Sequence, residues 1–555
     1  MEGIFYNTCP AAGCHQLCAL KVHVEGGRIR KVESADYPGD PEARSVCLKG
    51  LAGPRLVYHP DRLKYPLKRI GERGEGRWQR ISWDEALDTI AAKLLEVKKK
   101  YGSRSVKIMA ASSSHVGILM GRLMAARFAN AWGAGGVFEA KSHWLADMRV
   151  PAASLLTLGD SGQTHRPRDV VHSKMIIVWG GNPAETHFPN MRFILDAKDQ
   201  GAKLVVIGPL FDATAAKADR WIAIRPATDA ALAMAMIHVI IREGLYDREY
   251  VIRHTVAPFL VGEKDGRFLR QDGMHAVWDE TVQGPRPCDA DIVLPDATIY
   301  ERDDLAVNGD YLQLLEKAIE PLHETRTALE VWYELAERVG LGEYFRHTPQ
   351  DYMRMLLASG HPSLEGITFE RLEAEKIVRG NLPSPPEIPF ARGNFPTPSG
   401  RIEFYSESLV EFGEELPFHR ETLENPRRSP LAGRYPLIFL SAKVRATMHS
   451  IMANVDWMQE VSEEPLLHIN PVDAKKRAVA DGDWVVAFND RGKVKLKARL
   501  SEAVPPGTVN VPHGWWPERF AEGHYSDLLH RIDRGLAPFC VKECICGALR
   551  LGTSG

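Results

Sequence analysis

Residues 175–186 read Met-Ile-Ile-Val-Trp-Gly-Gly-Asn-Pro-Ala-Glu-Thr, an apolar run that ends in a loop rich in Gly, Asn and Pro. Two comparable runs follow, at residues 203–209 and 221–229, and each also ends in a loop that contains proline. Helical patterns separate the runs, and Thr228 is placed to cap the helix after the third. This alternation predicts a doubly wound parallel sheet, although a purely structural sheet would show the same rhythm.

Ligands of such sheets bind at the carboxyl ends of the strands, where these loops lie. The first run is not followed by Gly-x-Gly-x-x-Gly, and the chain has no Walker-type loop, so a nicotinamide dinucleotide is not the obvious ligand. Backbone amides of the loops suit phosphate groups, and Glu185 or Asp229 could accept hydrogen bonds from a base or a ribose.

Length and composition describe a globular protein of several domains. The chain has 555 residues, 44% of them hydrophobic and 26% charged, which gives an expectation of about three to five domains. The formal net charge is −2, a balance that argues against a nucleic-acid partner. The sequence shows no leader peptide at Met1 and no run of about 18 apolar residues. We therefore expect a cytoplasmic chain, with export or membrane anchoring only through a partner.

Cysteines cluster at the start of the chain. Four of the eight lie in the first tenth of the sequence, at Cys9, Cys14, Cys18 and Cys47. Residues 19–32 alternate apolar and polar around Gly26-Gly27, which predicts a hairpin that returns Cys47 to the other three. Four thiolates can hold an iron–sulfur cluster or a zinc ion. Three local ligands and one remote ligand favour the cluster, and Lys49 would then lie against it.

The rest of the chain predicts a linker and an all-β region. Residues 381–400 are rich in proline and are typical of an inter-domain linker. From residue 436 onwards, short strands with turn signals and no alternating helices predict a small barrel. Trp515, beside His513, could face a planar ligand or belong to the core. Cys540, Cys544 and Cys546 lack a metal-binding spacing and are interpreted as incidental thiols.

The expected fold is therefore α/β and multidomain. It comprises an N-terminal iron–sulfur hairpin module, doubly wound parallel α/β domains and a C-terminal β-barrel cap. The expected boundaries are 1–58 for the module, 59–165 for the first part of an α/β domain, 166–289 for a dinucleotide-binding-like α/β domain, 290–385 for the continued α/β domain, 386–435 for the linker and 436–555 for the barrel.

Taken together, these segments resemble the molybdopterin (or tungstopterin) guanine dinucleotide oxidoreductases of the dimethyl sulfoxide reductase superfamily. The motifs that carry the resemblance stand in family order along nearly the whole chain. They are the cysteine set ending in Cys47-Leu48-Lys49-Gly50, then residues 61–66, 80–86, 181–186, 225–229, 290–295 with Glu301, 397–403 and 489–492.

The resemblance implies the cofactors and the residues that bind them. The four N-terminal cysteines would ligate a [4Fe–4S] cluster, and Lys49 would lie between this cluster and a molybdenum (or tungsten) bis(molybdopterin guanine dinucleotide). Dinucleotide contacts are implied for Gly181, Asn182, Pro183, Glu185, Thr186, Gly208, Pro209, Thr214, Arg225, Thr228 and Asp229. Further contacts from the C-terminal domain are implied for Arg445, His449, Ser450, Asn454, His513 and Trp515.

The family takes its protein ligand to the metal from a loop that corresponds to residues 137–147, which contains no cysteine. Ser142 is the expected ligand and Asp147 the alternative, because a serine ligand suits oxygen-atom transfer. His143 and Trp144 would line the substrate funnel, although His143 could equally be an ordinary loop histidine.

These features imply the catalytic subunit of a molybdenum oxidoreductase acting on a small molecule. It would transfer an oxygen atom to or from an oxyanion, an S-oxide or an N-oxide, with electrons relayed through the cluster to an iron–sulfur partner subunit. Two alternatives stay open. One is a non-redox hydratase or transhydroxylase on the same scaffold, and the other is a truncated, inactive cofactor-binding remnant.

One departure from the family pattern has structural consequences. The chain is short for the family, and the shortage lies where residues 273–289 pass directly into the motif at residues 290–295. A gap of domain size should remove core strands and much of the second pterin's guanosine site. It should also expose apolar surface, unless another chain covers it.

Overall fold

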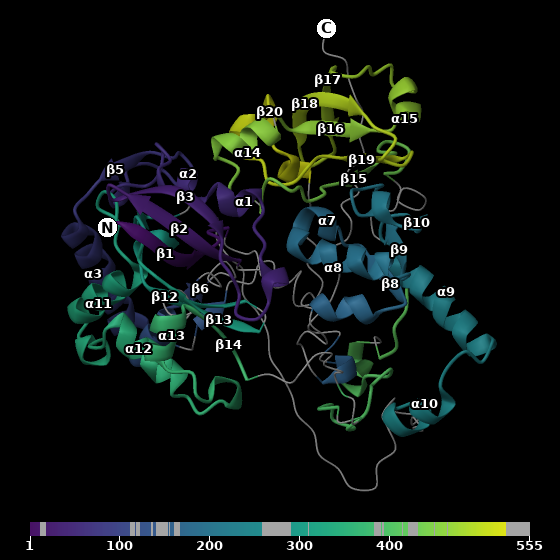
Figure 1. The fold of residues 1–555 in the computed structure, drawn as a ribbon. Coiled ribbons are helices and arrows are strands. Elements are labelled where there is room, and N and C mark those ends of the chain that lie inside the picture. Colours follow the sequence, from purple (N-terminus) through teal and green to yellow (C-terminus); the bar gives the residue numbers. More distant parts are fainter. Residues whose placement is uncertain are drawn as a thin grey trace. The chain divides into compact units, whose positions relative to one another are not determined.

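The computed structural model divides the chain into two compact units (Figure 1). The first unit comprises residues 1–141, 282–383 and 446–462, and the second comprises 142–281, 384–445 and 463–555. The structure describes residues 1–11, 18–110, 117, 123–134, 137–139, 154, 156–159, 167–257, 290–308, 310–381, 390, 393, 395–412, 415–419, 431–448, 450–462 and 464–528. Of the predicted site residues, Cys14, Ser142, His143, Trp144, Asp147 and His449 lie outside these ranges, as does the predicted shortage at 273–289.

The N-terminal hairpin is confirmed. Strands β1 (Gly3–Thr8), β2 (Ala19–Glu25) and β3 (Arg28–Ser34) form one antiparallel sheet in that order. The turn between β2 and β3 uses Gly26 and Gly27, whose φ angles are 58° and 68°. Two consecutive positive φ angles are what a tight hairpin turn requires, and glycine adopts them without steric cost.

The first unit surrounds this sheet with short helices and three small sheets. Its helices are α1 (Leu48–Leu51), α2 (Gly53–Val57), α3 (Trp83–Tyr101), α4 (Met124–Trp132), α11 (Ala328–Arg338), α12 (Pro349–Leu357), α13 (Phe369–Glu375) and α14 (Asp456–Val461). Its other strands are β4 (Leu67–Arg69), β5 (Trp78–Arg80), β6 (Ile108–Ala110), β7 (Val137–Glu139), β11 (Ile292–Val293), β12 (Asp304–Asn308), β13 (Tyr311–Leu315) and β14 (Ile377–Arg379). The sheet of order β11-β4-β5 pairs Ile292 and Val293 with the N-terminal part of the chain, and β12, β13 and β14 form a separate antiparallel sheet.

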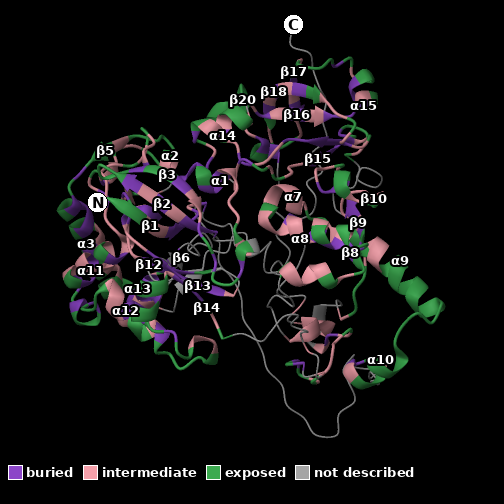
Figure 2. Ribbon diagram, viewed as in Figure 1, coloured by how far each residue is buried: buried purple, intermediate pink, exposed green. Residues whose placement is uncertain are grey.

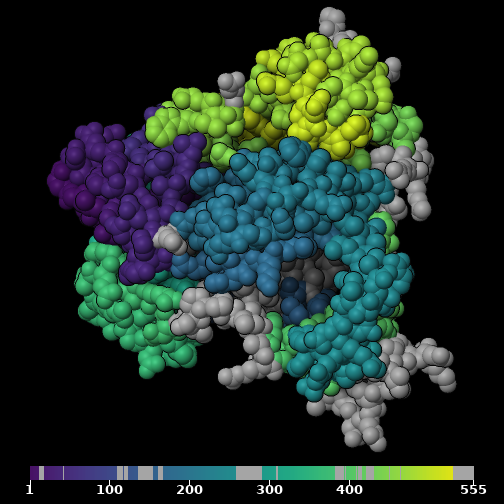
Figure 3. All heavy atoms as spheres, turned by 45° about the vertical axis from the view of Figure 1, so that its right-hand side comes forward, coloured from purple at the N-terminus to yellow at the C-terminus, as the bar shows by residue number. Residues whose placement is uncertain are grey.

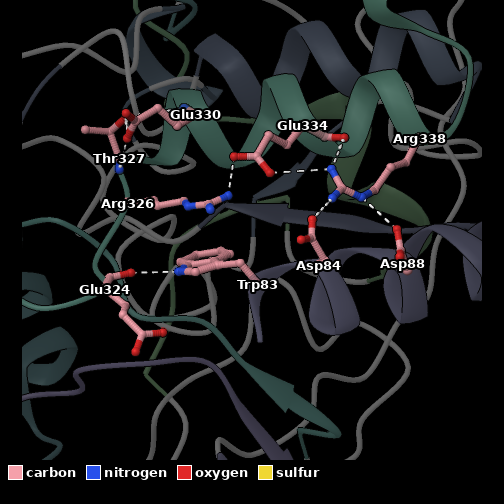
Figure 4. A network of polar contacts seen from close by, with 9 residues as sticks. All are labelled: Trp83, Asp84, Asp88, Glu324, Arg326, Thr327, Glu330, Glu334 and Arg338. Atoms are coloured by element: carbon pink, nitrogen blue, oxygen red, sulfur yellow. Dashed lines mark hydrogen bonds and ion pairs between the residues drawn. The ribbon is translucent and has the colours of Figure 1, made fainter. Parts of the chain in front are cut away.

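Helix α3 begins with a side-chain cap at Ser82. The Ser82 side chain accepts a hydrogen bond from the Glu85 amide, and the helix ends at Gly102. Figure 4 shows how α3 is tied to α11: Arg338 contacts Asp84 at 2.6 Å and Asp88 at 2.8 Å. Both aspartates are exposed, so these pairs orient the helices while the apolar core beneath them supplies most of the stability.

The second unit holds the predicted parallel sheet. Strands β8 (Met175–Trp179), β9 (Lys203–Gly208) and β10 (Arg220–Ala223) are parallel and lie in the order β10-β9-β8. Helices α7 (Pro183–Thr186) and α8 (Phe188–Asp199) connect β8 to β9, and α9 (Asp229–Arg242) and α10 (Arg248–His254) follow β10. Thr228 is the N-cap residue of α9, but its hydroxyl donates to the Arg225 carbonyl at 2.7 Å rather than capping a helix amide.

The C-terminal part of the second unit is a mixed sheet. Its strands β15 (Ile438–Leu440), β16 (Leu466–Ile469), β17 (Trp484–Phe488), β18 (Lys493–Leu500) and β19 (Thr508–Asn510) follow the order β15-β19-β16-β18-β17, and β20 (Glu522–Gly523) pairs with β18. Helix α15 (Pro471–Lys475) follows β16. Among the described strands nothing joins β15 to β17, so closure into a barrel stays a prediction.

Residues 446–462 do not belong to the same unit as this sheet. They lie in the first unit, where Met452, Val455 and Met458 pack around Ala52. Arg55 of α2 also stacks on the Trp457 ring, with 4.1 Å from the guanidinium carbon to the ring centroid. A segment that the sequence assigns to the C-terminal domain at 436–555 is therefore part of the core beside the N-terminal module.

Apolar surface is exposed in the second unit, as the predicted shortage requires. None of the 14 residues of α9 is buried, although the helix contains Met234, Ile237 and Ile241, which are 38%, 43% and 63% exposed. Figure 2 shows α9 and α10 as largely exposed, and Figure 3 shows the same segments at the surface. A helix that is hydrophobic on all sides is normally buried.

A histidine in the C-terminal sheet predicts a pH-dependent stability. Burial, and to a smaller extent the charge of Arg499, lowers the pKa of His468. The unfolded chain therefore binds a proton at pH values where the folded chain does not, so the free energy of unfolding decreases as pH falls below about 6.5. We expect His468→Gln to reduce this dependence. Denaturant titrations at about pH 5.5 and 7.5 measure it, and identical pH dependence in both proteins would contradict the expectation.

Candidate cofactor-binding site

Three of the four N-terminal cysteines lie in the described part of the chain, at the ends of secondary-structure elements. Cys9 follows β1 and Cys18 precedes β2, and the Cys9 amide donates to the Cys18 carbonyl at 3.2 Å. Cys47 is the residue before α1. Cys9 and Cys18 are buried and Cys47 is half-buried, an environment that protects a metal–thiolate centre from water.

Helix α1 approaches Cys9 closely because residue 50 is glycine. A Cβ atom at Gly50 would lie 3.7 Å from the Cys9 sulfur and 2.7 Å from the Val46 side chain. A larger residue would push α1, and with it Cys47, away from Cys9. The close approach therefore explains the glycine in the Cys-Leu-Lys-Gly motif and places α1, the helix that Cys47 precedes, beside Cys9. The assembly of all four cysteines around one cluster stays a prediction.

Lys49 is buried in α1, with only 3% of its surface exposed. Lysine is rarely fully buried, and its ammonium group needs negatively charged or polar neighbours when it is. A cluster held by four thiolates supplies such a neighbour, so the position of Lys49 two residues after Cys47 fits the group that the motif implies.

Tyr300 contributes a second buried polar group beside the cysteines. Its side chain is fully buried, and its hydroxyl hydrogen-bonds to no residue in the described part of the chain. A Cβ atom at Gly53 would lie 2.4 Å from this hydroxyl and 3.0 Å from Pro10, the residue after Cys9. The sequence analysis did not identify Tyr300, because a tyrosine inside an apolar segment gives no signal of its neighbours.

The loop after β8 carries several of the predicted dinucleotide contacts and is fixed by polar interactions. The Thr214 hydroxyl donates to the Asn182 side-chain oxygen at 2.7 Å and accepts from the Ala184 amide at 3.1 Å. Glu185 forms an ion pair with Arg445 at 2.9 Å. Gly181, Pro183 and Thr186 belong to the same loop and the short helix α7. The structure thus brings together residues from three separate predicted segments.

Thr214 itself is fully buried and supports the loop through these hydrogen bonds; its contact with the dinucleotide stays a prediction. Its neighbour Asp212, which the sequence analysis missed, accepts hydrogen bonds from the Thr214 and Ala215 amides. Burial raises the pKa of Asp212. The signal that could have found it is an Asp followed two residues later by Thr, typical of an Asx turn.

The other predicted contacts of the parallel sheet lie at the carboxyl ends of its strands. The Gly208 carbonyl at the end of β9 accepts a hydrogen bond from the Trp221 indole at 3.1 Å, and Pro209 follows. The Trp179 indole donates to the Asp229 carboxylate at 2.8 Å, so one oxygen of Asp229 already has a partner. Arg225 precedes α9, in the turn that Thr228 closes.

The predicted C-terminal contacts fall into both units. Ser450 and Asn454 lie in the first unit, where the Asn454 carbonyl contacts the His59 ring at 2.9 Å. Arg445, His513 and Trp515 lie in the second, where His513 is 3.4 Å from the Tyr525 hydroxyl. The Trp515 indole nitrogen is buried without a described hydrogen-bond partner, a donor that suits a bound polar ligand.

We predict that Thr214→Val weakens the loop after β8. Valine has a similar shape but leaves the Ala184 amide and the Asn182 side chain without their partner, a change that costs about 1–3 kcal/mol of folding free energy. Denaturant unfolding measures the loss, and retention of guanine nucleotide through desalting measures its effect on binding. Thr214→Ser keeps the hydroxyl and should behave like the wild type; equal losses in both variants would contradict the prediction.

Comparison with known proteins identifies the family. The model for the molybdopterin oxidoreductase Fe4S4 domain matches residues 4–59, that for molybdopterin oxidoreductase matches 62–278 and 287–338, and that for the molydopterin dinucleotide binding domain matches 437–537. The chain is 25% identical to dimethyl sulfoxide reductase DmsA of Escherichia coli (strain K12) over 744 positions, which cover 96% of this chain and 90% of DmsA.

Two further comparisons extend this result. Perchlorate reductase subunit alpha of Dechloromonas aromatica (strain RCB) is 39% identical over 257 residues, which cover 44% of this chain and 26% of that protein. The solved structure of acetylene hydratase from Pelobacter acetylenicus superposes with a TM-score of 0.78 at 20% identity, covering 99% of this chain and all of that one. This last likeness concerns the fold.

The fold, the buried cysteines and the three matched domains define a molybdopterin oxidoreductase. The chain belongs to the dimethyl sulfoxide reductase superfamily, as a catalytic subunit. Its cofactors are a [4Fe–4S] cluster and molybdenum bis(molybdopterin guanine dinucleotide). In the part of the chain that the structure describes, no helix is long and apolar enough to cross a membrane.

Two motifs that lie far apart in the sequence are in contact in the structure. Arg62, from the segment after the iron–sulfur module, forms a buried ion pair with Glu301, which follows the 290–295 motif. Glu301 also accepts hydrogen bonds from the Leu322 amide at 2.7 Å and the Thr298 amide at 2.6 Å. The pair joins the segment after the cysteine module to the segment that carries Tyr300.

Proposed function

We propose that this chain transfers an oxygen atom to or from a small oxyanion, S-oxide or N-oxide, with electrons relayed through the [4Fe–4S] cluster. The observation that carries the proposal is the arrangement around α1, where Cys47, buried Lys49 and the close approach of Gly50 to Cys9 form an electron-transfer module. The names of two relatives, a dimethyl sulfoxide reductase and a perchlorate reductase subunit, support the substrate class.

The residues of the chain have distinct tasks in this activity. Cys9, Cys14, Cys18 and Cys47 hold the cluster, and the burial of Cys9 and Cys18 keeps water away from it. Lys49 places a positive charge beside the cluster, which favours its reduced, more negative state. Asn182, held by Thr214, and Glu185, held by Arg445, fix the loop that receives a guanine dinucleotide. When bound, the molybdenum–pterin group supplies the two-electron oxygen exchange.

Ser142 is proposed as the protein ligand of the metal, with Asp147 as the alternative and His143 and Trp144 beside the substrate. We predict that Ser142→Cys replaces an oxygen ligand of molybdenum by sulfur. X-ray absorption spectroscopy of the loaded protein distinguishes the two ligands by bond length, because metal–sulfur bonds are longer than metal–oxygen bonds. An unchanged ligand set in Ser142→Cys, together with a changed one in Asp147→Cys, would assign the role to Asp147.

An iron–sulfur subunit is the proposed electron partner. Several relatives are named as subunits or chains of larger enzymes, and the N-terminal module provides the route by which electrons would leave this chain. Attachment to a membrane would then come through further partners.

The test is the cofactor content and activity of protein purified without oxygen. We expect about four iron atoms per chain, because a cubane has four, with one molybdenum and two guanosine nucleotides released by acid. Reduced viologen dye should be oxidised when dimethyl sulfoxide, trimethylamine N-oxide or chlorate is added. Iron without molybdenum would overturn the proposal and favour the inactive remnant. Turnover of an unsaturated substrate without any electron acceptor would favour the hydratase.

A further inference from the structure

Strand β8 lies at the edge of its sheet, although sheets of this type place the corresponding strand in the middle. In doubly wound sheets of strand order 3-2-1-4-5-6, the first strand has a neighbour on each side. Here the order β10-β9-β8 supplies strands 3-2-1, and no described strand pairs with the other side of β8. Met175 and Ile177, which point to the same face of β8, are 60% and 45% exposed.

Helix α9 continues this exposed region. The hydrogen bond from the Trp179 indole to Asp229 joins the end of β8 to the start of α9. The exposed apolar side chains on β8, on α9 and on the turn after α9 are called the α9 surface. They are Met175, Ile177, Met234, Met236, Ile237, Val239, Ile240, Ile241, Leu245 and Tyr246. Apolar side chains that gather on neighbouring elements in this way mark sites of interaction with other polypeptides.

The relatives show why this surface is uncovered. The alignment with DmsA runs over 744 positions, whereas this chain has 555 residues, so DmsA has stretches without a counterpart here. The match to the molybdopterin oxidoreductase family is interrupted between residues 278 and 287, after α9 and α10. The described residues contain no strand beyond β8, and we infer that the α9 surface is covered by another polypeptide.

We propose that the α9 surface of one chain packs against the α9 surface of a second copy, forming a two-fold symmetric dimer. The charge pattern of α9 suits such a pair, because its charged residues are Asp229 at the start and Arg242 at the end. Arg242 also contacts Glu243 at 2.6 Å, and both side chains are exposed, so the arginine can shift to a partner's aspartate. Two antiparallel copies place each aspartate near the arginine of the other and oppose the two helix dipoles. The open edge of β8 can pair with itself in the same arrangement.

The apolar character of the surface is typical of obligate homodimers, whose interfaces resemble a protein core cut in half. Two-fold dimers are also the commonest closed assemblies of soluble proteins. This inference concerns assembly alone and does not depend on the proposed function, because cofactor content and oligomeric state are measured separately.

The test is the mass of the purified holoenzyme by light scattering over a range of concentrations. We expect twice the chain mass of 62.0 kDa for the wild type, and the mass of one chain for the double variant Ile237→Glu/Ile241→Glu. Leu95→Glu is the matched control, since Leu95 of α3 is an exposed helical leucine, 43% accessible, in the other unit; it should remain a dimer.

Hydrogen exchange provides a second measurement that needs no substitution. In the wild type, the amides of β8 should exchange more slowly as the protein concentration rises, because dimerisation pairs them. A dimer that the double variant leaves intact would overturn the proposal. A wild-type monomer at every concentration would also overturn it, and would indicate that a different polypeptide covers the α9 surface.

A separate observation, the unpaired hydroxyl of Tyr300, supports a second inference. The main chain of Tyr300 is fixed because its carbonyl accepts hydrogen bonds from the Ala318 and Ile319 amides at 2.8 and 3.1 Å. The hydroxyl reaches Gly53 and the neighbourhood of Pro10. A tyrosine hydroxyl carries its proton at neutral pH, so it can act as a hydrogen-bond donor.

We propose that the Tyr300 hydroxyl donates a hydrogen bond to a sulfur atom of the [4Fe–4S] cluster at Cys9. A donor at this place withdraws electron density from the sulfur and raises the reduction potential of the cluster, since hydrogen bonds to the sulfurs are among the factors that set it. Tyr300 is thus a positioning residue that tunes electron transfer. The inference depends on the cluster and not on the identity of the substrate.

The test is a redox titration of Tyr300→Phe holoenzyme followed by electron paramagnetic resonance. We expect a lower midpoint potential than in the wild type at unchanged iron content. Tyr58→Phe is the control, because the Tyr58 hydroxyl in the same module accepts from the Ile29 amide and its loss should leave the potential unchanged. An unchanged potential in Tyr300→Phe, or loss of iron from that variant alone, would overturn the inference.

Discussion

Cys47→Ser is expected to remove the [4Fe–4S] cluster, so that iron falls from about four atoms per chain to less than one. Cys47 stands alone between the hairpin and α1, and no other cysteine in the described residues can replace it. The helix that Cys47 precedes, α1, approaches Cys9 closely at Gly50. Serine preserves the shape, so the fold survives while the metal is lost.

Iron content and the visible absorption of the cluster measure this loss. Activity is measured with an external donor whose electrons enter through the cluster. The rate should fall at least about a hundredfold, because the groups around the cluster cannot replace a missing thiolate. Cys288→Ser is the control, because Cys288 stands apart from the N-terminal set in the sequence. Full iron content in Cys47→Ser would show that another group ligates the cluster.

Glu301→Ala is expected to destabilise the first unit by about 3–5 kcal/mol, the usual result of removing one partner of a buried ion pair. The Arg62 and Glu301 side chains are 9% and 0% exposed. The alanine variant leaves the arginine charge buried without its carboxylate and also removes the acceptor of the Leu322 and Thr298 amides. Thus several polar groups lose their partners at once.

Denaturant unfolding followed by cluster absorption reports on the unit that contains the pair. Glu96→Ala is the matched control, because Glu96 forms an exposed pair with Lys93 at 3.0 Å, and removing such a pair costs about 1 kcal/mol or less. Glu301→Gln should fall between the two, since it keeps acceptors but not the charge. Equal effects of Glu301→Ala and Glu96→Ala would contradict the expected role of the buried pair.

Much of the fold follows from local sequence. The Gly26-Gly27 turn, the Ser82 cap and the runs that become β8, β9 and β10 each depend on residues close together in the chain. These features were predictable because the spacing of apolar residues follows the repeat of a helix or a strand, and caps and turns depend on a few neighbouring residues. The cysteine set was recognisable for the same reason, as three of its members share one short loop.

The remainder depended on contacts between distant segments. The sequence did not indicate that residues 446–462 pack with Ala52 in the first unit, because their apolar pattern fits either unit equally well. It did not identify Thr214 as a buried support for Asn182. Nor could it find Tyr300, whose significance comes from the hydroxyl that faces Gly53.

The sequence by itself determined where the parallel strands and the cysteine set lie, because periodicity and ligand spacing are local properties of the chain, and the motifs in family order indicated the family and its cofactors. Only the tertiary structure decided which motifs meet: Arg62 with Glu301, Glu185 with Arg445, and Tyr300 with the cysteine module. It also decided that α9 and the edge of β8 remain exposed. The physical reason is that burial is a property of the assembled chain, and a pattern of apolar residues does not state what covers them.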